Sequence, residues 1–182
     1  QQGRSMQPPT PVRASAEHAK SLIEVIKLQN KYLPSTYRLG LPDTHLEYTG
    51  CLRVTFLNPD DTLCEVQVPV TSKTTTLTVI SKVVEKTPFL NKYGGSIEQC
   101  DLYEIDDLCA EKKLSRDERP LISLQKWSKQ MIDVSLKQAA TIEVGFVLRI
   151  QDNTALAQAY RLNKSSLKEQ RKKKSSTWFK KK

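Results

Sequence analysis

The side chains best suited to chemistry in this sequence are cations at regular positions. Arg53 lies in an alternating apolar stretch, and Lys82 and Lys86 are four residues apart in a helical pattern. Alternation directs successive side chains to opposite faces of a strand, and a four-residue spacing places two lysines on one face of a helix. Cations held in this way attract carboxylates and phosphates. The pattern is typical either of a surface that binds acidic partners or of side chains that are merely solvated.

The sequence shows no pattern typical of an active site or a metal site. The four cysteines include no pair at metal-ligand spacing, and His18 and His45 lie outside the predicted sheet. The acidic residues at positions 106, 107, 117 and 118 have turn-like surroundings, and no Gly-rich phosphate loop occurs. We therefore predict a non-enzymatic domain without metal or cofactor, with reduced cysteines as in a cytoplasmic protein.

Positive charge is concentrated at the end of the chain. The 182 residues carry a net charge of +9, and Lys164 to Lys182 contribute nine basic residues and one acidic residue. A polybasic segment next to Trp178 and Phe179 predicts binding to anionic phospholipid at the inner face of the plasma membrane. A nuclear-localisation signal, a nucleic-acid tail and the start of a following domain fit the charge too. The candidate anion-binding residues are Arg171, Lys172, Lys173, Lys174, Lys180, Lys181 and Lys182.

Composition divides the chain into four parts. Residues 1–13 contain three prolines among polar residues and predict a disordered lead or a remnant of cloning. Residues 14–49 predict a helix ended by Pro34 and then a linker, and residues 50–153 predict the folded domain. Residues 154–182 predict a helix, expected over residues 155–170, followed by the polybasic tail. The chain is expected to be a piece of a larger protein.

The first half of the predicted domain reads as a hairpin followed by a helix. Residues 51–57 and 64–70 alternate between apolar and polar types, and a turn-rich segment separates them. Pro69 cannot donate a backbone hydrogen bond, which favours an edge position for the second strand. Ser72 or Thr74 is expected to cap the helix that follows, whose valines face inward and whose lysines face outward.

The second half predicts two short strands and a longer apolar one. Residues 100–105 alternate, and the near-continuous apolar run at residues 143–150 is typical of a central strand. Residues 127–141 predict either a loop or a short helix.

An ordered set of motifs in residues 50–153 resembles the Ras-associating domain family. The motifs are Cys51-Leu52-Arg53-Val54, Val68 to Thr75, Val79-Ile80, Val83 to Lys86, Cys100 to Ile105, Glu118 to Leu121 before Lys126-Trp127, and Gly145 to Arg149. The resemblance implies an α+β, ubiquitin-like β-grasp fold: a ββαββ-β mixed sheet with one main helix, flanked by N- and C-terminal helical extensions.

The resemblance further implies binding of a GTP-loaded Ras or Rap type GTPase by the edge of the second strand. The residues implied as GTPase contacts are Arg53, Gln67, Lys73, Lys82 and Lys86. The sequence departs from the family at Glu65, because some GTPase-binding members carry a basic residue on this strand. An outward Glu65 would repel an acidic partner.

Two other functions remain open at the level of sequence. One is a membrane-surface adaptor that uses the polybasic tail. The other is a structural ubiquitin-like lobe that binds no GTPase and packs against neighbouring domains through the helix containing Leu22 and Ile26.

Overall fold

The computed structural model describes residues 16–31, 35, 38–105, 110–125 and 145–179, with backbone alone for residues 173–179. The predicted lead over residues 1–13 and the segment at residues 127–141 lie outside the described residues. Among the helices that the structure describes, none is long and apolar enough to cross a membrane.

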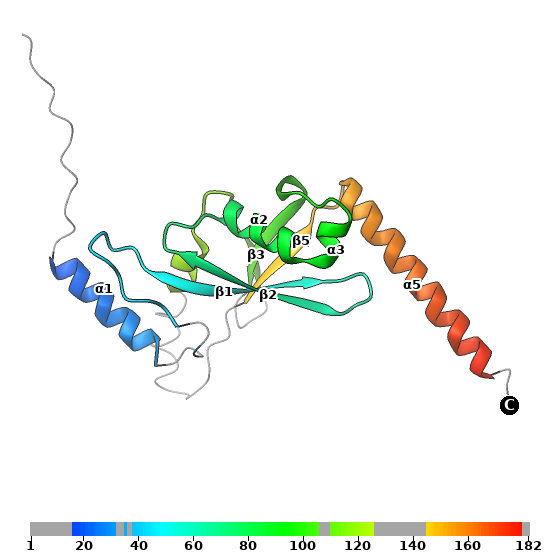
Figure 1. Cartoon of the computed structure of the whole chain (residues 1–182), viewed down its shortest axis with the longest axis horizontal. Coiled ribbons are helices and arrows are strands. Elements are labelled where there is room, and N and C mark those ends of the chain that lie inside the picture. Colours follow the sequence, from blue (N-terminus) through cyan, green and yellow to red (C-terminus); the bar gives the residue numbers. More distant parts are fainter. Residues whose placement is uncertain (1–15, 32–34, 36–37, 106–109, 126–144, 180–182) are drawn as a thin grey trace, which may run out of the picture.

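A mixed sheet of five strands forms the centre of an α+β fold (Figure 1). Its strand order is β2-β1-β5-β3-β4. The β1–β5 pair is parallel and the other neighbours are antiparallel. The strands are β1 Thr49–Leu57, β2 Leu63–Thr71, β3 Cys100–Ile105, β4 Glu111–Lys113 and β5 Gly145–Ile150.

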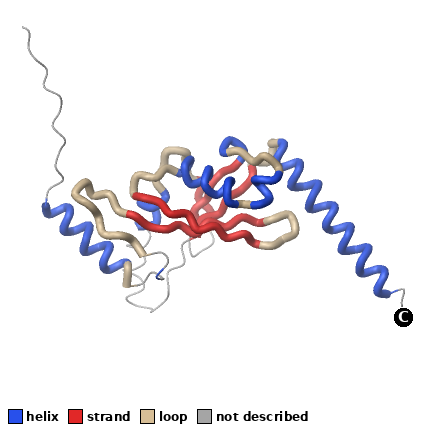
Figure 2. Tube along the Cα trace, in the orientation of Figure 1, coloured by secondary structure: helices blue, strands red, loops and turns tan. Residues whose placement is uncertain are grey.

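Helices lie against one face of this sheet and at the two ends of the molecule (Figures 1 and 2). They are α1 Ala16–Gln29, α2 Thr76–Lys86, α3 Pro88–Lys92, the 3-10 helix η2 Ile97–Gln99 and α5 Ala155–Phe179. Residues 120–125 are helical as well. In Figure 1, α2 and α3 lie against one face of the β1–β2 hairpin, while α1 and α5 lie at opposite ends of the molecule.

The β1–β2 hairpin forms as predicted. Because apolar and polar residues alternate along both strands, one face of the hairpin is buried and the other is exposed to solvent. Leu52, Val54 and Phe56 of β1 are buried, and the valines at positions 66, 68 and 70 of β2 are buried beside them. Arg53 and Gln67 face each other on the other side of the sheet. Burial of each apolar side chain contributes roughly 1.5 to 3 kcal/mol.

The expected cap of α2 is corrected by the structure. Thr75, rather than Ser72 or Thr74, is the N-cap residue, and its side-chain oxygen accepts a hydrogen bond from the Thr78 N–H at 3.4 Å. Ser72 instead accepts from the Tyr48 N–H at 3.3 Å, which ties the entrance of β1 to the exit of β2. A threonine at any of three neighbouring positions can cap, so the sequence could not select one.

The later strands agree with the sequence in type and order. The predicted strand at residues 100–105 is β3, and the predicted central strand is β5, which lies between β1 and β3. The other short strand is β4, three exposed residues in a segment that is charged and has no strand pattern, whereas the apolar residues that follow it are helical over 120–125. The C-terminal helix was predicted over residues 155–170 but continues to Phe179. The run Arg171 to Lys174 is therefore helical and not an extended tail.

Helix α1 contributes to the same core as the sheet. Ile26 is fully buried, and Leu22 packs against the core. The Asn30 side chain forms two hydrogen bonds of 2.8 Å with the backbone N–H and carbonyl of Leu39. The amide of Gln29 donates to the Gln125 carbonyl at 2.7 Å. The apolar stripe of α1 therefore has a partner within this chain.

Tyr48 is buried at the junction between α1 and the sheet, where its hydroxyl donates to the Gln125 side-chain oxygen at 2.8 Å. Burial raises the pKa of Tyr48 from 10.0 to about 12. The unfolded chain therefore loses this proton at a lower pH than the folded one. Tyr48 therefore leaves stability unchanged below pH 10 and lowers it as the pH rises from 10 towards 12.

We expect the free energy of unfolding to fall by about 2 kcal/mol or less across this alkaline range because of Tyr48. Burial raises the pKa of Cys100 to about 11, so this thiol contributes to the same decline. Urea unfolding of the wild type and of Tyr48→Phe, at neutral pH and near pH 11, separates the two groups. An equal alkaline loss in both proteins would assign the effect to groups other than Tyr48.

Candidate functional site

The outer side of β2 is the candidate site, because this strand lies at the end of the sheet. All nine residues of β2 pair with β1 on the inner side. In an antiparallel pair, alternate residues direct their N–H and carbonyl groups away from the partner strand. Three observations identify these outward residues as 63, 65, 67, 69 and 71.

First, Pro69 has no N–H group to exchange with β1. Second, the carbonyl oxygens of Gln67 and Pro69 accept hydrogen bonds from side chains of α2 and not from β1. Third, the Thr71 N–H donates to the Thr74 hydroxyl at 2.9 Å. The outward N–H groups of Glu65 and Gln67 therefore lie in the middle of this outer side, which we call the β2 edge.

Lys82 and Lys86 lie at the β2 edge, as their predicted role requires. The Lys82 ammonium donates to the Pro69 carbonyl at 3.0 Å, and the Lys86 ammonium donates to the Gln67 carbonyl at 3.3 Å. Both hydrogen bonds are near the protein surface, so they exchange readily with water or a competing donor. The lysines occupy two acceptors that a docking strand would need, and lysine is a residue that protects exposed strand edges.

Arg53 and Gln67 form a cross-strand pair next to this edge. They are opposite each other in the β1–β2 register, and both side chains are on the face of the sheet away from α2. Arg53 is half-buried and Gln67 is exposed. The predicted residues therefore approach the edge from both faces of the sheet, the lysines from α2 and Arg53 from β1.

Glu65 points outward, which was the condition under which it would oppose an acidic partner. It is exposed and faces Thr55 in the register, on the same side of the sheet as Arg53 and Gln67. The exposed face of the β2 edge thus carries a carboxylate at Glu65, on the hairpin-turn side of the Arg53–Gln67 pair.

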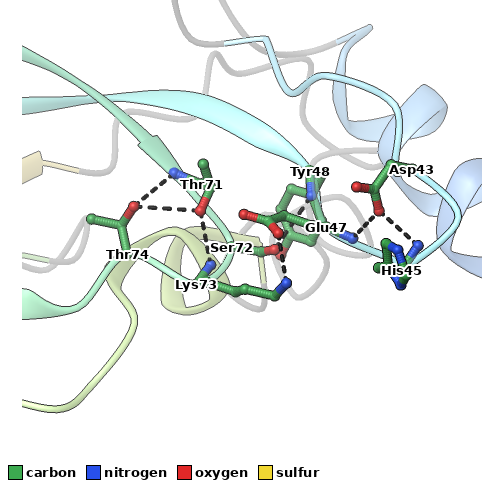
Figure 3. Close-up of polar contacts among 8 residues, drawn as sticks. All are labelled: Asp43, His45, Glu47, Tyr48, Thr71, Ser72, Lys73 and Thr74. Atoms are coloured by element: carbon green, nitrogen blue, oxygen red, sulfur yellow. Dashed lines mark hydrogen bonds and ion pairs between the residues drawn. The ribbon is translucent and has the colours of Figure 1, made fainter. Parts of the chain in front are cut away.

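Lys73 is separate from the other predicted contacts, because it pairs within the chain beyond the end of β2. Its ammonium lies 2.7 Å from a Glu47 carboxylate oxygen (Figure 3). This ion pair lowers the pKa of Glu47 and raises the pKa of Lys73. The lysine side chain is 60% exposed, so the pair is weak and the ammonium can still reach a partner.

The turn that holds Glu47 is built by Asp43. One carboxylate oxygen of Asp43 accepts from the N–H groups of His45 and Glu47 at 2.8 and 2.9 Å (Figure 3). These bonds lower the pKa of Asp43. They also support Leu46 at a φ of 60°, a backbone conformation that is unfavourable for a branched side chain. An aspartate whose carboxylate accepts from the backbone N–H two residues later forms an Asx-turn, and Asp43 is the sequence signal for this turn.

A groove of about 670 Å³ lies on the sheet face away from α2. Its cations are already matched by acids. Lys113 lies 2.7 Å from Asp101, and Arg149 forms an ion pair with Glu111. Its charges are therefore balanced internally, and it offers less to an acidic partner than the β2 edge does.

The described residues also contain no group of three or more potential metal ligands. The described cysteines, Cys51, Cys64 and Cys100, are free thiols. No protein-family model matches this sequence, and the search of curated proteins finds no significant match. The geometry of the β2 edge is therefore the main indication of function.

Proposed function

We propose that this chain is a non-catalytic interaction module with a ubiquitin-like β-grasp fold, and that it binds a GTP-loaded Ras or Rap type GTPase through the β2 edge. The observation that carries the proposal is the terminal position of β2 with outward N–H groups at Glu65 and Gln67. A partner strand can accept from these groups and extend the sheet. The strand order is compatible with a β-grasp fold.

The cations support an acidic partner of this kind. When a partner strand docks, its N–H groups replace the ammonium groups of Lys82 and Lys86 at the carbonyls of Pro69 and Gln67. The displaced ammonium groups are then next to the new strand and can pair with its carboxylates. The exchange conserves hydrogen bonds at the edge, so the affinity comes from the added strand pairing and from charge complementarity.

Titration with each GTPase in two nucleotide states tests this proposal. Ras and Rap are each loaded with a non-hydrolysable GTP analogue or with GDP, and binding is followed by calorimetry. We expect measurable affinity in the GTP-analogue state and at least about tenfold weaker binding in the GDP state. Equal affinities for the two states would exclude an effector role for this chain.

A substitution at Glu65 is predicted to increase the association rate. Replacing Glu65 with lysine removes the repulsive carboxylate and adds a cation, so association with an acidic partner should accelerate by roughly three- to tenfold at low salt. Because surface charges are screened by salt, the gain should shrink at high ionic strength. Stopped-flow association rates measure the effect. Glu98→Lys, a change at an exposed residue outside β2, is the matched control for net charge. An equal acceleration in both variants would place the partner elsewhere.

A further inference from the structure

The polybasic helix α5 contacts the β1–β2 turn through Tyr160. The Tyr160 hydroxyl donates to the carbonyl oxygens of Leu57 and Asn58 at 3.0 and 3.3 Å. Its ring also packs edge-on against Phe56 and Phe89. This attachment is in the second turn of the helix, and Figure 1 shows the rest of α5 extending away from the sheet.

Two cations of α5 continue the contact through ion pairs with an acidic turn. The Lys164 ammonium lies 2.8 Å from Asp61, and the Arg171 guanidinium lies 3.8 Å from the same carboxylate. Arg171 also donates to the Asp60 carbonyl at 2.8 Å. Lys164 and Arg171 are seven residues apart, which places them on one side of the helix after two turns. We call this set of contacts the acidic clasp.

Other side chains of α5 are exposed at the surface. Lys168 and Lys172 are exposed, and so is Leu162, with 71% of its surface accessible. The sequence adds Lys173 and Lys174 within the helix and the pair Trp178-Phe179 at its end. Few apolar residues lie among these cations, so binding by this helix would depend on charge more than on apolar insertion.

We propose that α5 binds the surface of an anionic membrane and that the acidic clasp competes with the lipid for two of its cations. This inference goes beyond the proposed GTPase binding and is independent of it. The charge of the helix is complementary to phosphatidylserine and related lipids. The sequence places Trp178 and Phe179 next to the basic runs, which favours a membrane interface over nucleic acid, because Trp is enriched at the interface between lipid and water.

If the acidic clasp competes with lipid, its removal should increase membrane binding. Lys164 and Arg171 contribute less to lipid attraction while both are paired with the Asp61 carboxylate. Asp60→Asn/Asp61→Asn removes both carboxylate charges. The turn should remain intact, because the side-chain oxygen of an asparagine at position 60 can still accept from the Thr62 N–H and asparagine tolerates the φ of 68° at position 61. A basic residue near an anionic surface changes partitioning by about fivefold. We expect the double variant to bind anionic vesicles about fivefold or more tightly than the wild type.

Vesicle sedimentation with phosphatidylserine-containing and pure phosphatidylcholine vesicles tests the proposal. Lys168→Gln/Lys172→Gln should lower binding to the anionic vesicles by about tenfold or more. Glu17→Gln/Glu24→Gln is the matched control, because it changes the net charge as the clasp variant does but lies on α1 at the far end of the molecule (Figure 1). The control should bind like the wild type, within about twofold.

Three results would overturn the inference. They are equal wild-type binding to both kinds of vesicle, equal gains in the clasp and control variants, and tighter binding to a duplex oligonucleotide than to the anionic vesicles at the same salt. The last result would assign the helix to nucleic acid. Because these measurements use no GTPase and the titrations above use no lipid, failure of one proposal is distinguishable from failure of the other.

Discussion

Replacing Gln67 with proline is expected to weaken GTPase binding by roughly a hundredfold, because it removes an outward N–H and leaves the partner's carbonyl without a donor. The proline ring also projects from the edge and obstructs a docking strand. The fold should tolerate this change, since Pro69 already occupies an equivalent outward position two residues away. Calorimetric titration with the GTP-analogue-loaded GTPase measures the loss.

Gln67→Ala is the matched control for this variant. It removes the same side chain but keeps the N–H group, so its affinity should remain within about threefold of the wild type. Circular dichroism and urea unfolding verify that both variants retain the fold. If proline and alanine weaken binding equally, the Gln67 side chain matters rather than the backbone, and strand addition at the β2 edge is contradicted.

Ile26→Ala is expected to destabilise the protein by about 2 to 4 kcal/mol, because it leaves a cavity at a fully buried position. Leu28 is on the same helix but is 39% exposed, so Leu28→Ala should cost less than about 1 kcal/mol. Urea unfolding of the two variants measures the difference. Equal and small losses would mean that α1 is dispensable for the fold.

This pair of variants bears on the alternative in which the helix containing Leu22 and Ile26 packs against other domains. The structure already gives that stripe a partner, because Ile26 is buried in the core and Leu22 packs against it. A large loss at Ile26 in the isolated chain would show that the buried position is satisfied without a neighbour. A lobe that needed a neighbouring domain would lose little stability at this position.

Local pattern was sufficient to predict β1, β2, α2, β3 and β5, but not the short elements α3, η2 and β4. Alternation in β1 and β2, the lack of an N–H at Pro69 and the apolar run of β5 predicted strand type, edge position and central position. Each of these signals acts within a single strand. The full order of strands across the sheet was not predicted, since alternation alone does not specify neighbours and the resemblance was used only for the order along the chain.

The contacts of the cations could not be predicted, because they join residues far apart in sequence. Lys82 reaches Pro69 across 13 positions, and Arg171 reaches Asp60 across 111. The length of α5 was underestimated for a related reason. A run of like charges predicts repulsion, but lysine and arginine are good helix formers, and the acidic clasp offsets two of the charges.

In the two proposals, the β1–β2 hairpin both provides the protein-binding edge and contacts the lipid-binding helix. Asp60 and Asp61, which hold α5, are in the turn that joins β1 to β2. If the GTPase partner is itself at a membrane, binding of α5 to lipid raises the effective concentration of the β2 edge near that partner. Recruitment to the inner face of the plasma membrane is the localisation that these proposals imply.

The most direct measurement is residue-resolved amide hydrogen exchange, by NMR, with and without the GTP-analogue-loaded GTPase. The account predicts that the N–H groups of Glu65 and Gln67 gain strong protection on binding, because they become bonded to the added strand. Alternate residues such as Val66 and Val68, which already bond to β1, should change much less. Protection concentrated away from β2, with Glu65 and Gln67 exchanging as in the free protein, would contradict the central claim.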